Sequence, residues 1–568
     1  MPSKPRWFLL LIAGFVAVAV ESFLVPPPHA RRSPPRDLSA TSDQSDEARD
    51  DKDVGRSVSF CGGTMELTWH DSIGDIPASQ WDACCLARSG NHSSKSPFLE
   101  HAWLHSLEES GCASAETGWI PRHLSIRIVG EEEDVLTGNN ETATSTTIDG
   151  CVPVYLKTHS MGEFIFDSSW AEAAYRNGIE YFPKLLVGVP FTPVSGPRIL
   201  WHSRVLETFP LEYLDGAVGS FLKQTALGHN WSTVHINFCT DQEATVLSSY
   251  EGQECELYPD EPDSAISNNN RNEIDNDDTD RIRQRLQALL LRHLRRNNTD
   301  TFLRRTSLQY HWQNRHPLQS GRPFTDFEDY LSCFRSKRRI NIRRERTLAR
   351  QGQQLYPRQD DDDSNCRPIR IDAIVGADIL QVEGLVEQMF EIYRSTVDKL
   401  YWGRQYLTLE FFQRLCQSSF IHNLCFLCAR YDDDVNGSTG TVSWDAKDVF
   451  AGTFNVVKDG VFYGRYWGCL PGHDIKNLHF ETCYWAAIEY CIQNCLLRME
   501  PGAGGGDYKW ARGFDPQVIH SVHYVCNPWL RQAIFHFIES ETEYHLSLRH
   551  ELLDRSSVAE RENLKSAT

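Results

Sequence analysis

The chain has 568 residues and a formal net charge of −20, with 40% hydrophobic and 11% aromatic residues. This much apolar surface excludes a wholly disordered protein, and the length predicts two or three domains. The acidic balance excludes a general polyanion binder, although it still allows a local basic site. The 17 cysteines lack a regular framework spacing, so we expect reduced thiols rather than disulfides.

Residues 1–62 are typical of a targeting presequence and a disordered linker. Lys4 and Arg6 precede an apolar run over residues 7–20, which is too short for a confident membrane span and is typical of a signal segment. A basic tract rich in Ser and Pro follows. This order resembles a bipartite plastid presequence, so we expect import into the plastid (chloroplast) by the secretory route. Secretion, an endomembrane location and a signal anchor are the alternatives.

A first folded block is expected over residues 63–250. Apolar periodicity and turn residues predict its elements. The expected strands cover residues 64–72, 122–130, 150–167, 183–200 and 232–239, and the expected helices cover residues 78–90, 98–111, 169–178 and 211–227.

An insertion rich in acidic residues and Asn is expected over residues 251–300, with an amphipathic helix near its end. A second folded block follows over residues 301–553, and residues 554–568 form a tail. The expected strands of this block cover residues 302–314, 423–431, 448–457, 460–469, 497–504 and 511–525. Its expected helices cover residues 326–352, 379–397, 408–420 and 477–496, with a terminal helix ending near residue 553.

The two blocks have a similar order of elements: helices, strands, a helix, a strand, a turn and a strand. This order predicts a mixed α/β (α+β) fold in which each block has a mostly antiparallel mixed sheet flanked by helices. We therefore expect two tandem copies of one fold, although no strong internal sequence repeat is present.

The run "RSKRRINIRRERTLARQG" is the strongest local charge feature. Arg335, Arg339, Arg343, Arg346 and Arg350 are spaced by three or four residues, so a helix would place them on one face. Such a face could bind phosphate groups, could be a solvated face balanced by nearby acidic loops, or could bind nucleic acid.

The segment "YLKTHSMGEFIFDSSW" is the first candidate site, because it combines Lys157, His159, Glu163 and Asp167. An imidazole near carboxylates can act as a general base. A hydrogen-bonded loop and edge strand is the alternative interpretation. The following "VPFTPVSGPR" is a rigid turn in which Arg198 could contact an anion.

The second block has three further candidate segments: "FYGRYWGC", "HFETCYWAAIEY" and "EPGAGGGDYKWARGF". The chain has no GxGxxG after a strand, no GxxxxGK[ST], no G-x-S-x-G and no HExxH. A single CxxC, Cys425 to Cys428, lies in an apolar strand-like run. We expect it to pack in the core, with a metal or redox pair as the alternative, and we predict no metal site.

Taken together, "SPFLEHAWLHSLEESG", "VPVYLKTHSMGEFIFDSSWAEAAYRNGIEYFPKLLVGVPFTPVSGPRIL", "QYHWQNR", "SKRRINIRRER", "LHFETCYWAAIEY" and "KWARGF" resemble the FemAB-like proteins, in a branch labelled peptidoglycan biosynthesis or recognition. The resemblance covers about residues 64–250 and 300–550. It implies two tandem GNAT-like domains (acyl-CoA N-acyltransferase fold). It also implies transfer of an acyl or aminoacyl group to an amine, such as that of a peptidoglycan-like precursor.

On this resemblance we assign candidate residues to two roles. The catalytic candidates are His159, Glu163, Asp167, His479 and Glu481. The substrate-binding candidates are Lys157, Arg198, Arg339, Arg343, Arg346, Arg465, Trp467, Lys509 and Arg512.

The expected partners are a small-molecule or peptide-like amine and an acyl donor, with no stable membrane span in the mature chain. We expect no permanently bound cofactor; acyl-CoA or aminoacyl-tRNA would be the co-substrate. The usual GNAT pyrophosphate signature, Arg or Gln followed by xxGxG/A, is not evident, which weakens the case for CoA. A non-catalytic binder of an anionic or peptidoglycan-like ligand, or an RNA-binding protein, is the alternative.

Overall fold

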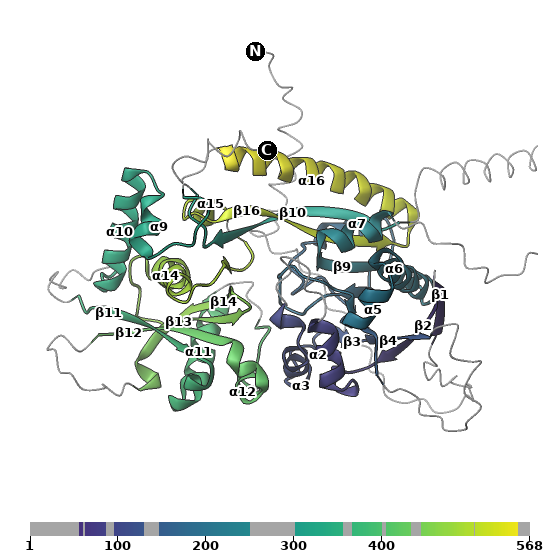
Figure 1. The fold of residues 1–568 in the computed structure, drawn as a ribbon, viewed down its shortest axis with the longest axis horizontal. Coiled ribbons are helices and arrows are strands. Elements are labelled where there is room, and N and C mark those ends of the chain that lie inside the picture. Colours follow the sequence, from purple (N-terminus) through teal and green to yellow (C-terminus); the bar gives the residue numbers. More distant parts are fainter. Residues whose placement is uncertain are drawn as a thin grey trace, which may run out of the picture. The chain divides into compact units, whose positions relative to one another are not determined.

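Two sheets and the helices packed on them account for most of the described chain (Figure 1). The computed structural model describes residues 56–60, 63–86, 96–129, 147–249, 301–317, 319–355, 366–399, 405–432, 445–504 and 506–554. These residues all belong to one unit, Asp53–Thr568. The predicted signal segment, the insertion with its helix, and the C-terminal tail lie outside the described residues.

The first half alternates short strands with helices. Its strands are β1 (Arg56–Phe60), β2 (Gly63–His70), β3 (Trp119–Pro121), β4 (His123–Val129), β5 (Gly150–Val152), β6 (Val154–Lys157), β7 (Lys184–Val187), β8 (Leu200–Trp201) and β9 (Thr233–Cys239). Its helices are α2 (Ala78–Leu86), α3 (His101–Glu109), α4 (Ser168–Arg176), α5 (Ser203–Thr208), α6 (Leu211–Gly228) and α7 (Asp241–Ser249).

The second half has longer strands. These are β10 (Leu303–Gln313), β11 (Ile369–Val375), β12 (Leu424–Tyr431), β13 (Val449–Lys458), β14 (Val461–Cys469), β15 (Arg498–Glu500) and β16 (Asp515–Val525). Its helices are α9 (Phe327–Ser332), α10 (Ser336–Arg350), α11 (Leu385–Lys399), α12 (Leu409–Gln417), α13 (Leu478–Phe480), α14 (Ala486–Gln493), α15 (Gly506–Trp510) and α16 (Pro528–Asp554).

The larger sheet is continuous through both halves. Its strand order is β11-β12-β13-β14-β15-β10-β16-β9-β7-β6-β3, and a second sheet has the order β1-β2-β4-β5-β8. Only the pairs β7–β9 and β14–β15 are parallel among the described strands. The prediction of a mixed, largely antiparallel α+β fold is therefore confirmed.

The halves are joined through β16. This strand belongs to the second half but pairs with β9 of the first half, whereas β10 pairs with β15 within the second half. β10 and β16 also pair with each other along most of their length. Figure 1 shows these two strands running side by side with α16 along them. The larger sheet therefore runs through both halves, and the pairing of β9 with β16 is the link between them.

Burial explains why the central strands have apolar sequences. Every residue of β9 is buried, as are seven of the eight residues of β12. The pair Cys425 and Cys428 lies on β12, where residues three apart face opposite sides of a sheet. They belong to two different hydrophobic clusters. The interpretation of this CxxC as core packing therefore fits the structure.

Several elements differ from the expectation. β11 was not expected, and the strand expected over residues 150–167 ends at Lys157, so Glu163 and Asp167 lie in the loop after β6. β1 lies within the expected linker. The single helix expected over residues 326–352 is two helices, because the chain is extended at Arg335 and this turn allows the fully buried Phe334 to enter the core. The helix expected over residues 477–496 contains a π-helical turn, η7 (Glu481–Trp485), between α13 and α14.

Candidate functional site

β14 and β15 separate in the second half and leave a pocket. They pair in parallel over three residues, ending with Tyr463 opposite Glu500. Beyond this point β14 pairs only with β13, and Arg465 is the extra residue of a bulge in that pairing. Gly464 lies where the strands part; a Cβ there would come within 3.3 Å of Pro501 Cα. Bulges re-aim side chains and leave one residue out of the ladder, and they are common next to active sites.

The pocket has a volume of about 160 Å³. β13 and β14 supply Thr453, Asn455, Gly464, Arg465, Tyr466 and Trp467. The segment around η7 supplies His479, Cys483 and Tyr484. The turn before α15 supplies Pro501 and Ala503, and α15 supplies Tyr508 and Lys509. Four predicted site residues, Arg465, Trp467, His479 and Lys509, are therefore brought together here. Two of them are cations.

Lys509 is almost fully buried at the wall of this pocket. Its Nζ donates hydrogen bonds to the carbonyl oxygens of Gly502, at 2.6 Å, and Ala503, at 3.4 Å. Burial lowers the pKa of Lys509 to about 8, so the side chain is mostly charged at neutral pH. Lys509 thus holds the glycine-rich turn and also presents positive charge to the pocket.

His479 lies against Trp467, with ring centroids 5.4 Å apart. Burial, followed by the charges of Arg512 and Lys509, lowers the pKa of His479 to about 4. Its imidazole is therefore neutral at physiological pH. Burial also raises the pKa of Cys483, so the thiol in the same pocket stays protonated and is a poor nucleophile.

Arg465 connects the pocket with the first half. Its Nη2 donates a 2.6 Å hydrogen bond to the carbonyl of Phe191, and its guanidinium lies 5.3 Å from the ring centre of Phe98. Burial lowers the pKa of Arg465, but an arginine remains protonated. One wall of the pocket therefore depends on a loop from the other half.

Glu481 does not line the pocket with His479. It is fully buried on the other side of η7, where both of its carboxylate oxygens accept hydrogen bonds from Arg346. Arg350 also donates to Glu481, at 2.8 Å, and both arginines bind Glu489. A carboxylate held in this way is an anchor for α10, so its predicted role as a base is not supported.

The arginine stripe on α10 is largely balanced by acidic groups. Arg343 pairs with Glu328, and Arg339 donates to the carbonyl of Phe334 at 2.6 Å. The stripe therefore fits the solvated-face alternative better than a continuous phosphate-binding wall. Arg512 is similarly packed, with its guanidinium 3.6 Å from the ring centre of Phe480 and a hydrogen bond to Glu345.

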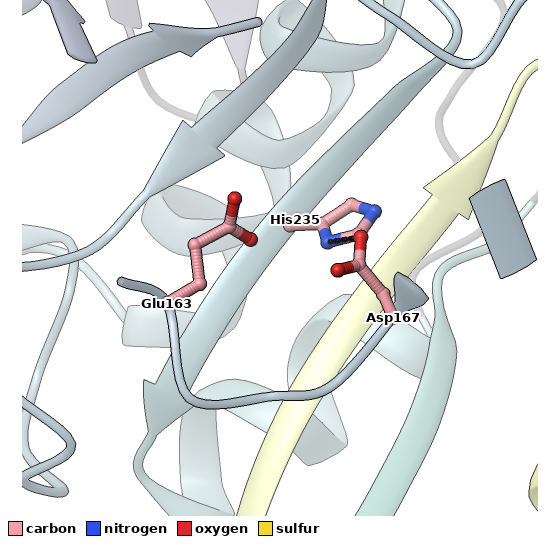
Figure 2. A group of neighbouring side chains, drawn as sticks. All are labelled: Glu163, Asp167 and His235. Atoms are coloured by element: carbon pink, nitrogen blue, oxygen red, sulfur yellow. Dashed lines mark ion pairs between the residues drawn. The ribbon is translucent and has the colours of Figure 1, made fainter. Parts of the chain in front are cut away.

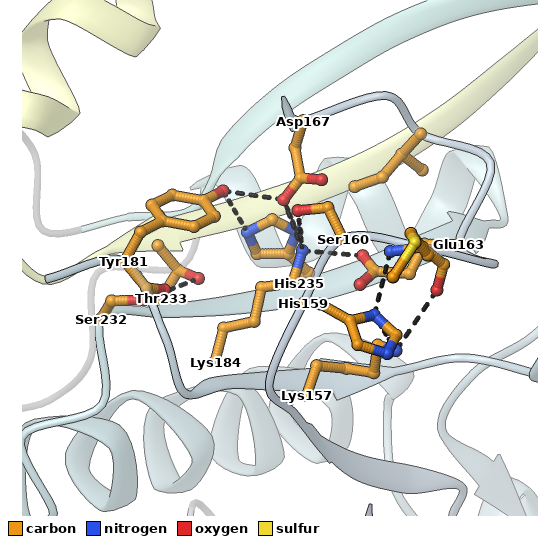
Figure 3. A network of polar contacts seen from close by, with 12 residues as sticks. Lys157, His159, Ser160, Glu163, Asp167, Tyr181, Lys184, Ser232, Thr233 and His235 are labelled. Carbon is orange, nitrogen blue, oxygen red and sulfur yellow. Dashed lines mark hydrogen bonds and ion pairs between the residues drawn. The ribbon is translucent and has the colours of Figure 1, made fainter. Parts of the chain in front are cut away.

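The first-half candidates form a separate buried network (Figure 3). Lys184, which was not among the predicted residues, lies between two carboxylates: its Nζ is 2.9 Å from Glu163 Oε2 and also pairs with Asp167. The Tyr181 hydroxyl donates to Asp167 at 2.8 Å. The side chains of Lys184, Glu163 and Asp167 are completely shielded from solvent.

Lys157 and His159 lie at the edge of this network. Lys157 Nζ lies 3.7 Å from the ring centre of Trp119, and it contacts His159 Nδ1 and the carbonyl of Met161 at 3.3 Å each. His159 Nε2 donates to the carbonyl of Thr117 at 2.8 Å. These contacts hold the loop after β6 in place, which supports the structural alternative for His159.

Burial shifts the ionisation of the network in opposite directions. It raises the pKa of Glu163 to about 7 and lowers the pKa of Lys157 to about 7. For Asp167, burial acts to raise the pKa, but the charge of Lys184 outweighs it and the pKa falls below its ordinary value. Burial and then Lys184 lower the pKa of His235 to about 3.

Glu163, Asp167 and His235 have the donor atoms of a small cation site, all within 4.8 Å of one another (Figure 2). The ammonium of Lys184 contacts both carboxylates of this group. It already supplies the positive charge that a metal ion would bring, so these residues fit an internal ion-pair network better than a metal centre.

The place in the first half that corresponds to the second-half pocket is occupied by a loop. β7 and β9 also pair in parallel over three residues. Gly188 follows the paired residues of β7, just as Gly464 follows the paired residues of β14. The loop that contains Gly196 lies against β9 here, and Gly196 N donates a 3.0 Å hydrogen bond to the carbonyl of Phe238 on that strand.

Arg198 completes this closure. Its buried guanidinium donates to four backbone carbonyls, those of Val194, Gly196, Pro197 and Asn237. In place of the predicted contact with a substrate, Arg198 therefore ties the loop to β9.

Several buried polar residues were missed in the sequence, among them Lys184, His235, Gln309, His311 and Glu500. Each lies in or beside a strand whose neighbours are apolar, so periodicity alone assigns it to a core face. The signal that could have found them is a charged or imidazole side chain within an otherwise buried strand.

Among the described residues, no helix combines the length and apolar character needed to cross a membrane. No curated protein matches the chain. Among solved structures, the chain is similar to FemX, with 9% identity over 83% of this chain and 100% of that chain and a TM-score of 0.37. It is also similar to L-PGS from Bacillus licheniformis, with 5% identity over 69% and 86% and a TM-score of 0.33. A protein of unknown function from Bacteroides thetaiotaomicron has 10% identity over 80% and 98% and a TM-score of 0.34.

The family comparison covers most of both halves. A FemAB-like family model, described as peptidoglycan biosynthesis/recognition, matches residues 72–257 and 290–558. The matched ranges include the pocket between β14 and β15, the first-half network and strands β10 and β16. The chain therefore belongs to the FemAB-like family of peptidoglycan biosynthesis and recognition proteins.

Proposed function

We propose that this protein is an N-acyltransferase that moves an acyl or aminoacyl group to an amine, and that the transfer occurs in the pocket between β14 and β15. The observation that carries the proposal is the parting of two parallel strands at Gly464, next to a bulge at Arg465 and a buried lysine. Family membership supports an amine acceptor related to peptidoglycan precursors.

The pocket has the groups that acyl transfer requires. When an amine attacks an acyl carbon, negative charge develops on the carbonyl oxygen and must be stabilised by preorganised donors. The bulge residue Arg465 lies outside the strand ladder, so its N–H is placed to serve as such a donor. Lys509 and the Arg465 guanidinium supply positive charge for an anionic donor molecule.

The donor would be an acyl-CoA or an aminoacyl-tRNA, and the helix α10 bears on this choice. Arg335, Lys337 and Arg344 are exposed, and no described carboxylate pairs with them. Phosphate groups of a polynucleotide could bind there. If aminoacyl-tRNA is the donor, changing the three residues to Glu should weaken tRNA binding and lower its salt dependence by about one unit of slope per lost phosphate contact.

The test is a transfer assay with the purified chain, isotopically labelled acyl-CoA or aminoacyl-tRNA, and amine acceptors that include peptidoglycan-type precursors. Mass spectrometry would detect the labelled amide. Lys509→Met should lower transfer at a low donor concentration by about 10- to 100-fold, because it removes a charged contact to the anionic donor molecule worth about 1.5–3 kcal/mol. Lys447→Met is the matched control, because Lys447 is an exposed lysine of the same half, 79% exposed and paired with Asp445.

Two results would contradict the proposal. Binding of a peptidoglycan-like ligand without transfer from any donor would make the protein a recognition protein. Equal transfer by the Lys509→Met and Lys447→Met variants would show that the reaction does not occur in this pocket.

We also propose that the protein acts in the plastid. The motivation is the order of the signal-like segment and the basic Ser/Pro-rich tract in residues 1–62. A fluorescent protein fused to residues 1–62 should enter the plastid, and its secretion would refute this location.

A further inference from the structure

A histidine and a glutamate lie next to each other close to the start of the pocket. His311 is on β10 and Glu500 is the last residue of β15, one step beyond the paired residues Trp312 and Met499. The His311 Nε2 and Glu500 Oε2 atoms are 3.9 Å apart. Pro501, the residue after Glu500, lines the pocket.

The position of the proton on His311 follows from its neighbour. Gln309 Nε2 donates a 2.8 Å hydrogen bond to the carbonyl of Pro193, which leaves Gln309 Oε1 as the acceptor. His311 Nε2 lies 3.4 Å from that oxygen and therefore donates its hydrogen to it. In a neutral imidazole the other nitrogen then has a free lone pair. Gln309 thus directs Nδ1 of His311 to act as the proton acceptor.

Charged groups around His311 act on its pKa in both directions. Glu500 and Arg498 on β15 and Lys509 on α15 all act on it electrostatically. Burial is the largest influence and lowers the pKa of His311, while Glu500 opposes this effect. The imidazole is therefore neutral at pH 7, and the nearby carboxylate would stabilise it once it gains a proton.

Glu500 has capacity for this second role. One of its oxygens accepts a 2.9 Å hydrogen bond from Arg498, whereas Oε2 is buried and has no hydrogen-bond partner. A buried carboxylate oxygen without a partner is costly unless a charge appears near it during function. The His311 side chain is 11% exposed, so it keeps a small area open to solvent.

We propose that His311 is the proton acceptor for the attacking amine, with Gln309 and Glu500 as positioning residues. This inference rests on the proposed transferase function. As the new C–N bond forms, the ester C–O or thioester C–S bond of the donor breaks and its electron pair leaves with the oxygen or sulfur. The amine proton passes to Nδ1 of His311 and then to that leaving group, so the reaction yields an amide and a free hydroxyl or thiol.

The kinetic test compares His311→Gln with the wild-type chain. We expect kcat to fall by about 10²–10⁴-fold, as for removal of a general base. We also expect little change in KM and the loss of the acidic limb of the pH–rate profile. His316→Gln is the matched control, because His316 is another buried imidazole just after β10 and its side chain is 2% exposed. A His311→Gln enzyme with wild-type kcat and an unchanged pH profile would overturn the assignment.

NMR of the protein labelled with ¹⁵N-histidine measures the protonation state of His311 directly and does not depend on catalytic activity. The wild-type protein should show His311 as the neutral Nε2–H form at pH 7, and Gln309→Leu should give a mixture of the two neutral forms. An Nδ1–H or fully protonated His311 in the wild type would also refute the proposal.

The two proposals can be refuted separately. If the wild-type chain transfers no acyl group, the proposed function is wrong. If it transfers an acyl group and His311→Gln is unaffected, only the role of His311 is wrong.

Discussion

The ionisation of Glu163 provides the most direct test of the first-half network. Its side chain is completely shielded, and burial raises its pKa from 4.5 to about 7. Between these two pH values the folded protein holds a proton that the unfolded chain releases, so stability falls as pH rises through this window. At 1.36 kcal/mol per pH unit, the full shift corresponds to a loss of about 3 kcal/mol by pH 8.

The substitution Glu163→Gln removes this titration but keeps an oxygen for Lys184. We therefore expect the variant and the wild type to have similar free energies of unfolding at pH 5, where the wild-type side chain is protonated in the fold. At pH 8 the variant should be more stable than the wild type by up to about 3 kcal/mol.

Urea denaturation at pH 5, 6, 7 and 8, followed by both circular dichroism and fluorescence, measures this difference. Glu172→Gln is the matched control, because Glu172 is an exposed glutamate on α4 paired with Arg176. Its effect on stability should not vary between pH 5 and 8. A constant difference between Glu163→Gln and the wild type across this range would refute the reasoning, because it would mean that Glu163 does not change its charge there.

Three further substitutions test other parts of the structure. Lys184→Met leaves two buried carboxylates without their cation and should destabilise the protein by about 3–5 kcal/mol in the same urea experiment. Arg346→Met leaves Glu481 buried with fewer partners and should clearly lower the melting temperature, whereas Arg343→Met, at an exposed pair, should leave it unchanged. Arg198→Met removes the donors to four carbonyls, so hydrogen exchange of the loop around residues 189–198 should accelerate without a comparable change in β12.

Much of the fold was predictable from local patterns. Apolar periodicity located α3, α6, α11 and α12, and runs of apolar residues located β9 and β12–β14, because each of these elements buries one face or is buried on both. The break between α9 and α10 was missed. The segment from Asp326 to Gly352 has no Pro or Gly before its end to mark a break, and the extended backbone at Arg335 accompanies the packing of the Phe334 ring in the core.

The candidate site was predictable in part. Arg465, Trp467, His479 and Lys509 were expected to be site residues, and the structure gathers them around one pocket. Glu481 is two residues from His479, and helical spacing places the two on different faces. In the structure Glu481 lies in the π-helical turn and pairs with Arg346, while His479 lines the pocket.

Composition, charge and periodicity were sufficient to establish an α+β protein with two similar halves and reduced, mostly buried cysteines. These properties depend on residue types and on their spacing along the chain, both of which can be read from the sequence. The pairing of β16 with β9, the closure of the first half by Arg198 and the meeting of His311 with Glu500 depend on contacts between residues far apart in the chain. Such contacts arise only when the sheet assembles, because many pairings of similar apolar strands satisfy the same local pattern and only packing selects one of them.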